Sequence, residues 1–133
     1  MYTVRHNMAK RNEMKDELGK HVLLDCKGEI AHMNEEALSQ MMHNAAKAAR
    51  ATVLFSNFHQ FGGGGGVTGV LVLAESHITV HTWPEYNYAA FDIFMCGDCD
   101  VDEAIEVIRA TSKKSVFDIK KIARGVALRT STI

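Results

Sequence analysis

Strict alternation of polar and apolar positions marks one segment of the chain. Residues 77–83 read HITVHTW, which is the two-residue period of a strand with one buried face. One face would carry His77, Thr79, His81 and Trp83, and the other Ile78, Val80 and Thr82. Pro84 follows, and since proline cannot continue the ladder of a central strand, we expect the strand to end there.

Other segments are predicted from composition and from helical spacing. Five further strands are expected in runs rich in β-branched and apolar residues: 19–28, 51–59, 67–74, 88–96 and 116–123. An amphipathic helix is expected after Asn34, a favourable N-cap, and a second one over residues 100–114. The order β-α-β-β-β-β-α-β, with hairpins between the central strands, predicts an α+β fold. We expect a two-layer α/β sandwich, a mainly antiparallel sheet with two helices on one face.

Length and charge limit the possible functions. The chain has 133 residues, enough for one domain, which we place at residues 18–133 after a polar N-terminal extension at 1–17 that carries no motif. Its 15 basic and 16 acidic residues indicate neither a nucleic acid nor a membrane partner. The N-terminal residues resemble neither a secretory signal nor a membrane span, so we expect a cytoplasmic protein. Three cysteines without framework spacing are expected to be reduced thiols.

Two motifs have weak functional interpretations. The five glycines Gly62–Gly66 could cradle a phosphate, but they lack the Lys-Ser/Thr ending of a P-loop and precede a strand, so a surface loop or the lip of a binding site is favoured. The CGDC sequence, from Cys96 to Cys99, has the spacing of a redox or zinc pair. A single CxxC supplies only half of a zinc site, and we expect no metal. A buried Cys96 at a strand end is the simpler interpretation.

The sequence AESHITVHTWPE carries the strongest chemical signal. Ser76 falls where one strand must turn into the next, and Glu75 before it has no apolar role. A serine in a strained turn can attack the preceding carbonyl and convert the amide into an ester. A base that then removes the serine α-proton eliminates the upstream chain, so the sequence raises the hypothesis of self-cleavage.

Those residues closely resemble the short prokaryotic S-adenosylmethionine decarboxylases. The resemblance covers residues 18–125 and includes LGKHVLLD upstream, FHQF and GVTGV between, and the following EYNYAAFDIFMCGD. The resemblance implies cleavage between Glu75 and Ser76 into a β chain (1–75) and an α chain (76–133). It implies a pyruvoyl group made from Ser76, which forms a Schiff base with the substrate amine and releases CO2, in a polyamine and spermidine pathway. It also implies roles for the other site residues. His81 would be the base for processing, Cys96 the proton donor and Thr68 a support for processing. Phe61 would stack on the adenine, and Glu85 would bind the ribose.

The chemistry accounts for these residue types as well. Decarboxylation of an α-amino acid needs an electron sink, and a pyruvoyl ketone can supply it as pyridoxal phosphate (PLP) does elsewhere, so no PLP is expected. In an extended strand, Ser76 and His81 would lie about 16 Å apart, at about 3.3 Å per residue. We therefore expect a homodimer with shared sites, Ser76 and Cys96 from one protomer and the remaining residues from the other. After cleavage it would contain two α and two β chains.

Three alternatives remain open. The glycine run replaces a loop that contains Ser and Pro in the family, so a pyruvoyl-dependent arginine or ornithine decarboxylase is possible. A non-enzymatic regulatory or binding homologue would leave the chain uncut. A CxxC redox module would depend on Cys99 and not on Ser76.

Overall fold

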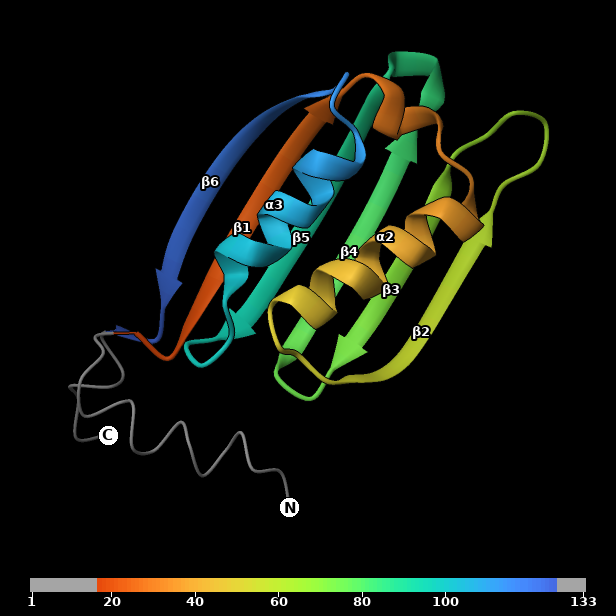
Figure 1. The fold of residues 1–133 in the computed structure, drawn as a ribbon. Coiled ribbons are helices and arrows are strands. Elements are labelled where there is room, and N and C mark those ends of the chain that lie inside the picture. Colours follow the sequence, from red (N-terminus) through yellow and green to blue (C-terminus); the bar gives the residue numbers. More distant parts are fainter. Residues whose placement is uncertain (1–16, 127–133) are drawn as a thin grey trace.

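One six-stranded sheet organises the protein (Figure 1). The computed structural model describes residues 17–126. The strands lie in the order β2-β3-β4-β5-β1-β6, and every neighbouring pair is antiparallel. Their bounds are β1 Gly19–Lys27, β2 Val53–Gln60, β3 Val67–Leu73, β4 Ser76–Trp83, β5 Tyr88–Cys96 and β6 Val116–Arg124. The first strand in sequence is thus inserted between the last two.

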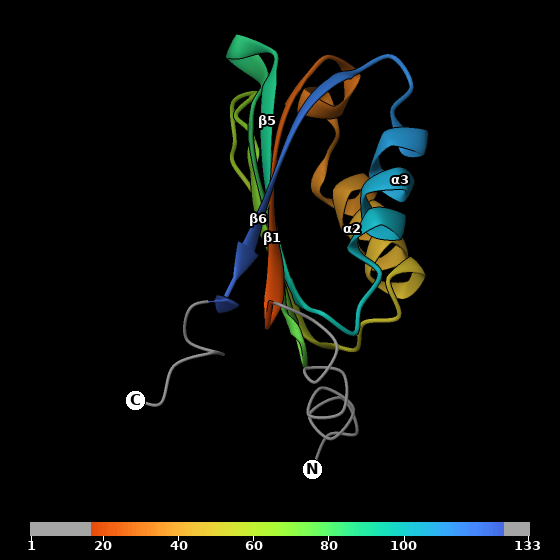
Figure 2. The ribbon, with the colours of Figure 1, turned by 90° about the vertical axis from the view of Figure 1, so that its left-hand side faces the viewer.

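Both α-helices pack on the same face of this sheet (Figure 2). Helix α2 (Glu35–Ala48) begins after Asn34, whose side chain accepts a hydrogen bond from the Ala37 amide at 2.8 Å. Helix α3 (Val101–Thr111) begins after Asp100, whose carboxylate accepts from the Glu103 amide at 3.3 Å. These caps satisfy amides that a helix start leaves unpaired. Two 3-10 turns, η1 (Glu29–His32) and η2 (Pro84–Tyr86), complete the described elements.

The core lies between the helices and the sheet. On β4, Ile78 and Val80 are fully buried on the helix side, whereas His81 and Trp83 are exposed on the opposite side. The alternation predicted for this strand is therefore confirmed. No helix of the described residues covers the second sheet face, which we call the open face (Figure 2).

The predicted fold class is confirmed: an α+β two-layer sandwich with two helices on one face. All eight strands and helices occur in the predicted order, and only the two 3-10 turns were not predicted. The proposed N-terminal extension at residues 1–17 lies almost entirely outside the described residues. The single domain at 18–133 stays a prediction.

The five-glycine run forms the hairpin between β2 and β3. The Phe61 amide donates to the Gly66 carbonyl oxygen at 2.9 Å and closes the loop. Gly63 and Gly64 have φ of 66° and 78°, a region in which other residues are strained. A Cβ on Gly66 would lie 1.9 Å from the Thr82 carbonyl oxygen, so only glycine fits there. The run links two strands and does not lead into a helix as a P-loop does.

Candidate active site

The turn between β3 and β4 places Ser76 in an unfavourable backbone conformation. Leu73 pairs with Ser76 across the hairpin, which leaves Ala74 and Glu75 as the turn. The φ angle of Ser76 is 148°, in the range that favours glycine. Strain of this kind costs about 1–3 kcal/mol and persists only where the surrounding structure enforces it. The bond between Glu75 and Ser76 is thus presented in a strained hairpin, as the sequence suggested.

Thr52 holds this turn in place. The Ala74 amide donates to the Thr52 carbonyl oxygen, and the Thr52 amide donates to Glu75 Oε1, each at 2.9 Å. Glu75 is buried, and this hydrogen bond gives it the structural role that its sequence position did not reveal. Thr52 was not predicted as a site residue, because only the pairing of β2 with β3 brings it to the turn.

Cys96 lies beside Ser76. Ser76 pairs with Met95 across β4 and β5, and Cys96 is the next residue. The Cys96 side chain is buried, and a hydrogen bond from the Cys99 thiol lowers the pKa of Cys96 to about 7. The same hydrogen bond, together with burial, raises the pKa of Cys99. The negative charge of Glu75 acts on both thiols, which places Glu75 near them. We call Glu75, Ser76, Cys96 and Cys99 the serine end of the sheet.

A second group lies at the other end of the same strands. Thr68 pairs with His81 across β3 and β4, and Thr68 Oγ1 lies 3.2 Å from His81 Nδ1, a hydrogen bond on the open face. Glu85 is exposed in η2, which follows β4 directly. Phe61 stands at the glycine hairpin with 50% of its surface exposed. Figure 1 shows that this hairpin and η2 lie at one end of the sheet, opposite the β3–β4 turn. We call these four residues the histidine end.

The structure brings each group together but keeps the two groups apart. Ser76 and His81 stand at opposite ends of β4 (Ser76–Trp83), five residues apart and hence about 16 Å at about 3.3 Å per residue. His81 also faces away from the helices. A single chain therefore does not bring its imidazole to its own Ser76.

Another cluster on the open face was missed by the sequence analysis. His21 Nε2 and His77 Nε2 lie 2.7 Å and 3.1 Å from Asp92 Oδ1. Burial alone would raise the pKa of Asp92, but the two imidazole hydrogen bonds outweigh it and lower the pKa. Arg124 Nη1 lies 3.1 Å from His21 Nδ1. Since arginine only donates, Nδ1 of His21 accepts and its Nε2 carries the proton.

These three side chains are close enough to hold a metal ion. The protonated Nε2 of His21 and the neighbouring guanidinium favour a hydrogen-bonded network over metal coordination. The available sequence signal was the alternation that assigns His77 to the polar face. It could not show that His21 and Asp92, from two other strands, meet there, because the strand order is not written in the sequence.

The fold is shared with a small α+β decarboxylase of known structure. The structure is similar to the crystal structure of the adenosylmethionine decarboxylase from Aquifex aeolicus, with a TM-score of 0.70 and 32% sequence identity, over 81% of this chain and 91% of that one. Neither helix in residues 17–126 has the length and apolar character that a membrane span requires.

Sequence comparison identifies the family. Residues 20–125 match the S-adenosylmethionine decarboxylase family. A relative from Methanococcus aeolicus is 45% identical over 112 residues, which cover 81% of this chain and 94% of the relative. A relative from Thermosipho africanus is 52% identical over 113 residues, which cover 81% and 85%. Both are S-adenosylmethionine decarboxylase proenzymes. The chain belongs to this family, which confirms the resemblance seen in the sequence.

Family membership does not favour the three alternatives to an S-adenosylmethionine decarboxylase. It favours a decarboxylase over a non-enzymatic homologue and over a redox module. It likewise does not favour arginine or ornithine as the substrate class.

Proposed function

We propose that this chain is a proenzyme that cuts itself between Glu75 and Ser76 and then decarboxylates S-adenosylmethionine. The products of the cut would be a β chain of residues 1–75 and an α chain of residues 76–133. The observation that carries the proposal is the strained φ of Ser76 in the β3–β4 turn, where Ser76 pairs with Met95, the residue before Cys96. The names of the relatives, which are proenzymes, support the cut, and the same names support the substrate.

The residues of the turn account for the first step. Ser76 Oγ attacks the carbonyl carbon of Glu75, and the peptide nitrogen leaves as the amine, so that an ester replaces the amide. Opening the amide releases the strain at Ser76. The two hydrogen bonds that join Thr52 to residues 74 and 75 hold the turn during this rearrangement. A base then removes the α-proton of Ser76, and the ester oxygen departs with Glu75.

A pyruvoyl group at residue 76 is the expected outcome, after water replaces the nitrogen as ammonia. It would supply the electron sink that decarboxylation of an α-amino acid requires. Position 76 fits such a group, since it begins β4 beside a thiol whose pKa is near 7. Cys96 is the proposed acid, because its thiol can deliver a proton near neutral pH to the carbon that loses CO2. Neither PLP nor a metal ion is part of this proposal.

The histidine end supplies the remaining roles. His81, oriented by the hydroxyl of Thr68, is the proposed base for self-cleavage. The exposed ring of Phe61 is suited to stack on adenine, and its π-face can also attract the sulfonium cation. The exposed carboxylate of Glu85 is suited to accept hydrogen bonds from the ribose hydroxyls.

A homodimer would unite the two ends. Two chains that meet through their open faces in a two-fold arrangement could place the histidine end of one beside the serine end of the other. After cleavage this assembly would hold two α and two β chains. The free thiols of Cys26, Cys96 and Cys99 support the expectation that it works in the cytoplasm, where thiols stay reduced.

An intact-mass measurement tests the proposal. The purified protein is denatured and weighed before and after incubation with S-adenosylmethionine and cyanoborohydride. We expect two fragments that divide before Ser76, with the C-terminal fragment lacking a free amine and gaining the substrate-derived mass. Parallel incubations use arginine or ornithine instead. A cut chain that gains mass only in those incubations would overturn S-adenosylmethionine as the substrate. An uncut chain would overturn the self-cleavage.

A further inference from the structure

The Cys96–Cys99 pair is not fully used by the proposed reaction, which needs only one thiol. We propose that these two cysteines are a reversible modification site: a peroxide oxidises them to a disulfide, which removes the proton donor and switches the decarboxylase off. The loss of activity rests on the proposed function, whereas the disulfide itself does not. This differs from a redox module, because the pair regulates the site and transfers no electrons to a substrate.

The backbone already places the two residues at disulfide distance. The Cys99 amide donates to the Cys96 carbonyl oxygen at 3.1 Å, which closes a four-residue turn through Gly97 and Asp98. Such a turn brings its first and last Cα atoms within about 7 Å. Disulfides span Cα separations of about 4.4–6.8 Å. The thiols also interact directly, since the hydrogen bond from Cys99 lowers the pKa of Cys96.

The position in the fold favours the chemistry. Cys96 ends a strand, and Cys99 immediately precedes Asp100, the N-cap of α3. Within the pair, Cys96 has the thiol that ionises more easily, because the Cys99 thiol donates a hydrogen bond that lowers the pKa of Cys96. A pKa of about 7 makes a large fraction of Cys96 thiolate at neutral pH, and thiolate is the nucleophile.

A cavity borders Cys99 but not Cys96, and Cys96 keeps a small exposed surface of its own. A cavity of about 220 Å³ is bordered by Gly97, Asp98 and Cys99, and it also touches Lys20 and Arg50. Cys96 and Cys99 each retain 8% exposure. This opening suits a molecule of the size of hydrogen peroxide.

Peroxide oxidises the pair in two steps. The Cys96 thiolate attacks one oxygen of the peroxide and becomes a sulfenic acid, and hydroxide leaves. The Cys99 thiol then attacks the Cys96 sulfur, the S–S bond forms, and water leaves. Overall, two thiols lose two electrons and two protons, and the peroxide is reduced to two molecules of water. A thiol reductant reverses the change.

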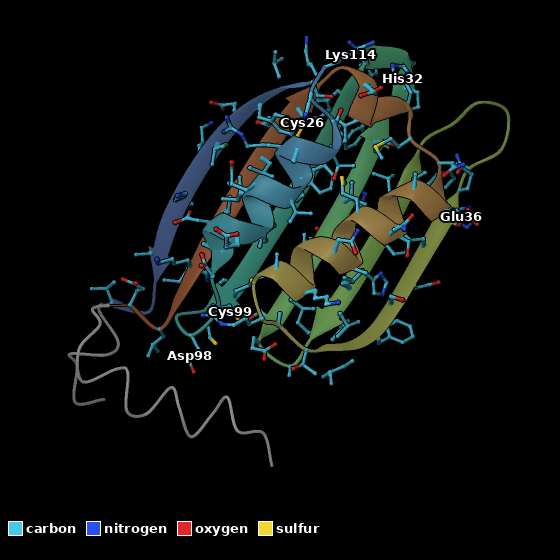
Figure 3. All side chains as sticks on the ribbon, viewed as in Figure 1. Cys26, His32, Glu36, Asp98, Cys99 and Lys114 are labelled. Carbon is cyan, nitrogen blue, oxygen red and sulfur yellow. The ribbon has the colours of Figure 1, made fainter. Side chains whose placement is uncertain are left out.

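The third cysteine cannot substitute for Cys99. Figure 3 shows Cys26 at the opposite end of the sheet from Cys99. Cys26 is buried in the core, and burial raises its pKa to about 12, so its thiol is not ionised at neutral pH. Cys26 lies in the β chain and the other two cysteines in the α chain, so intact masses distinguish them after cleavage.

The test treats the reduced enzyme with hydrogen peroxide in the presence of dimedone, which traps sulfenic acids. We expect the wild-type α chain to lose two hydrogen atoms, to carry no dimedone and to resist alkylation at both cysteines. Cys99→Ser should instead acquire dimedone on Cys96, because no second thiol can displace it. Cys26→Ala should behave as wild type.

Activity provides a second readout, measured against each variant's own untreated rate. Peroxide should lower the wild-type rate by about 10²–10⁴-fold, the range for loss of a general acid, and dithiothreitol should restore it. A wild-type α chain that gains oxygen or dimedone, or that pairs with Cys26 or another molecule, would overturn the modification site. A disulfide formed without loss of turnover would overturn the switch and the role of Cys96. A disulfide in a chain that never cuts itself would support the site and contradict only the proposed function.

Discussion

The two ends of the β3–β4 hairpin carry opposite kinds of chemistry. At the serine end, Glu75, Cys96 and Cys99 are buried, the backbone of Ser76 is strained, and Thr52 clamps the turn. At the histidine end, Phe61 and Glu85 are exposed, and the Thr68–His81 hydrogen bond lies on the open face.

In the proposed reaction, a single chain would assemble the reacting bond but not its base. The serine end is completed by its own fold, because the strain and the thiol both depend on local pairing. In the proposed homodimer, the histidine end would be completed by the approach of a second chain. Variants at the two ends should therefore affect different steps of the reaction.

The largest effect is expected from His81→Ala. This change should slow self-cleavage by about 10²-fold or more, because a general base is lost. If the base acts across a dimer, co-expression with Ser76→Ala should rescue it. Each mixed dimer then has one site with the serine of the His81→Ala chain and the histidine of the Ser76→Ala chain. Intact mass should show cleavage of the His81→Ala chain alone.

Each variant expressed by itself is the control: Ser76→Ala should remain uncut, and His81→Ala should cut only at its slowed rate. If mixing rescues neither chain although mixed dimers form, the base acts within one chain. The two ends would then have to meet by a rearrangement of the hairpin and not by dimerisation.

Cys96→Ala should separate cleavage from turnover. Self-cleavage should proceed, since the serine, the clamp and His81 are intact. Decarboxylation should fall by about 10²–10⁴-fold, because the substrate carbon loses its proton donor. The two rates are measured by mass and by release of CO2. Equal loss of both rates would place Cys96 in processing and contradict its assignment.

Loss of the hydrogen bond between the Thr52 amide and Glu75 is expected to have a smaller effect. Glu75→Ala removes the acceptor for the Thr52 amide, a hydrogen bond worth about 1 kcal/mol, so cleavage should slow about fivefold. Glu75→Gln keeps an acceptor oxygen at the same position and should cut at nearly the wild-type rate. Time courses of the intact mass measure both variants. If Glu75→Gln cuts itself as slowly as Glu75→Ala, the charge of the carboxylate and not its hydrogen bond controls the rate of cleavage.

The smallest effect is a shift in pH dependence. The proposed acid must be protonated, so kcat/KM should be highest below the Cys96 pKa of about 7 and fall as the pH rises through it. Cys99→Ala removes the hydrogen bond that lowers this pKa and should move the alkaline limb upward, toward the ordinary thiol value of 9.0. Cys99→Ser keeps a hydroxyl donor and should shift it less. An unchanged limb in Cys99→Ala would mean that another group controls it.

Much of the fold could be predicted because the pattern of each segment is local. The alternation of HITVHTW identified its buried face, and Asn34 marked a helix start that the structure confirms with a hydrogen bond. The sheet order could not be predicted, because the placement of β1 between β5 and β6 depends on packing between distant segments. For the same reason the sequence did not reveal that His21, His77 and Asp92 form one network.

The candidate site likewise combines features that the sequence predicts with features that only the structure shows. The sequence by itself determined which residue types are present: a serine after a glutamate at a turn, a thiol at a strand end, and a histidine too far along the strand to reach the serine. It also determined the family, because those motifs occur in one order. Only the tertiary structure decided that Ser76 is strained, that Thr52 clamps Glu75, and that Cys99 tunes Cys96. These features arise from contacts between chain segments, and such contacts exist only after the strands have paired.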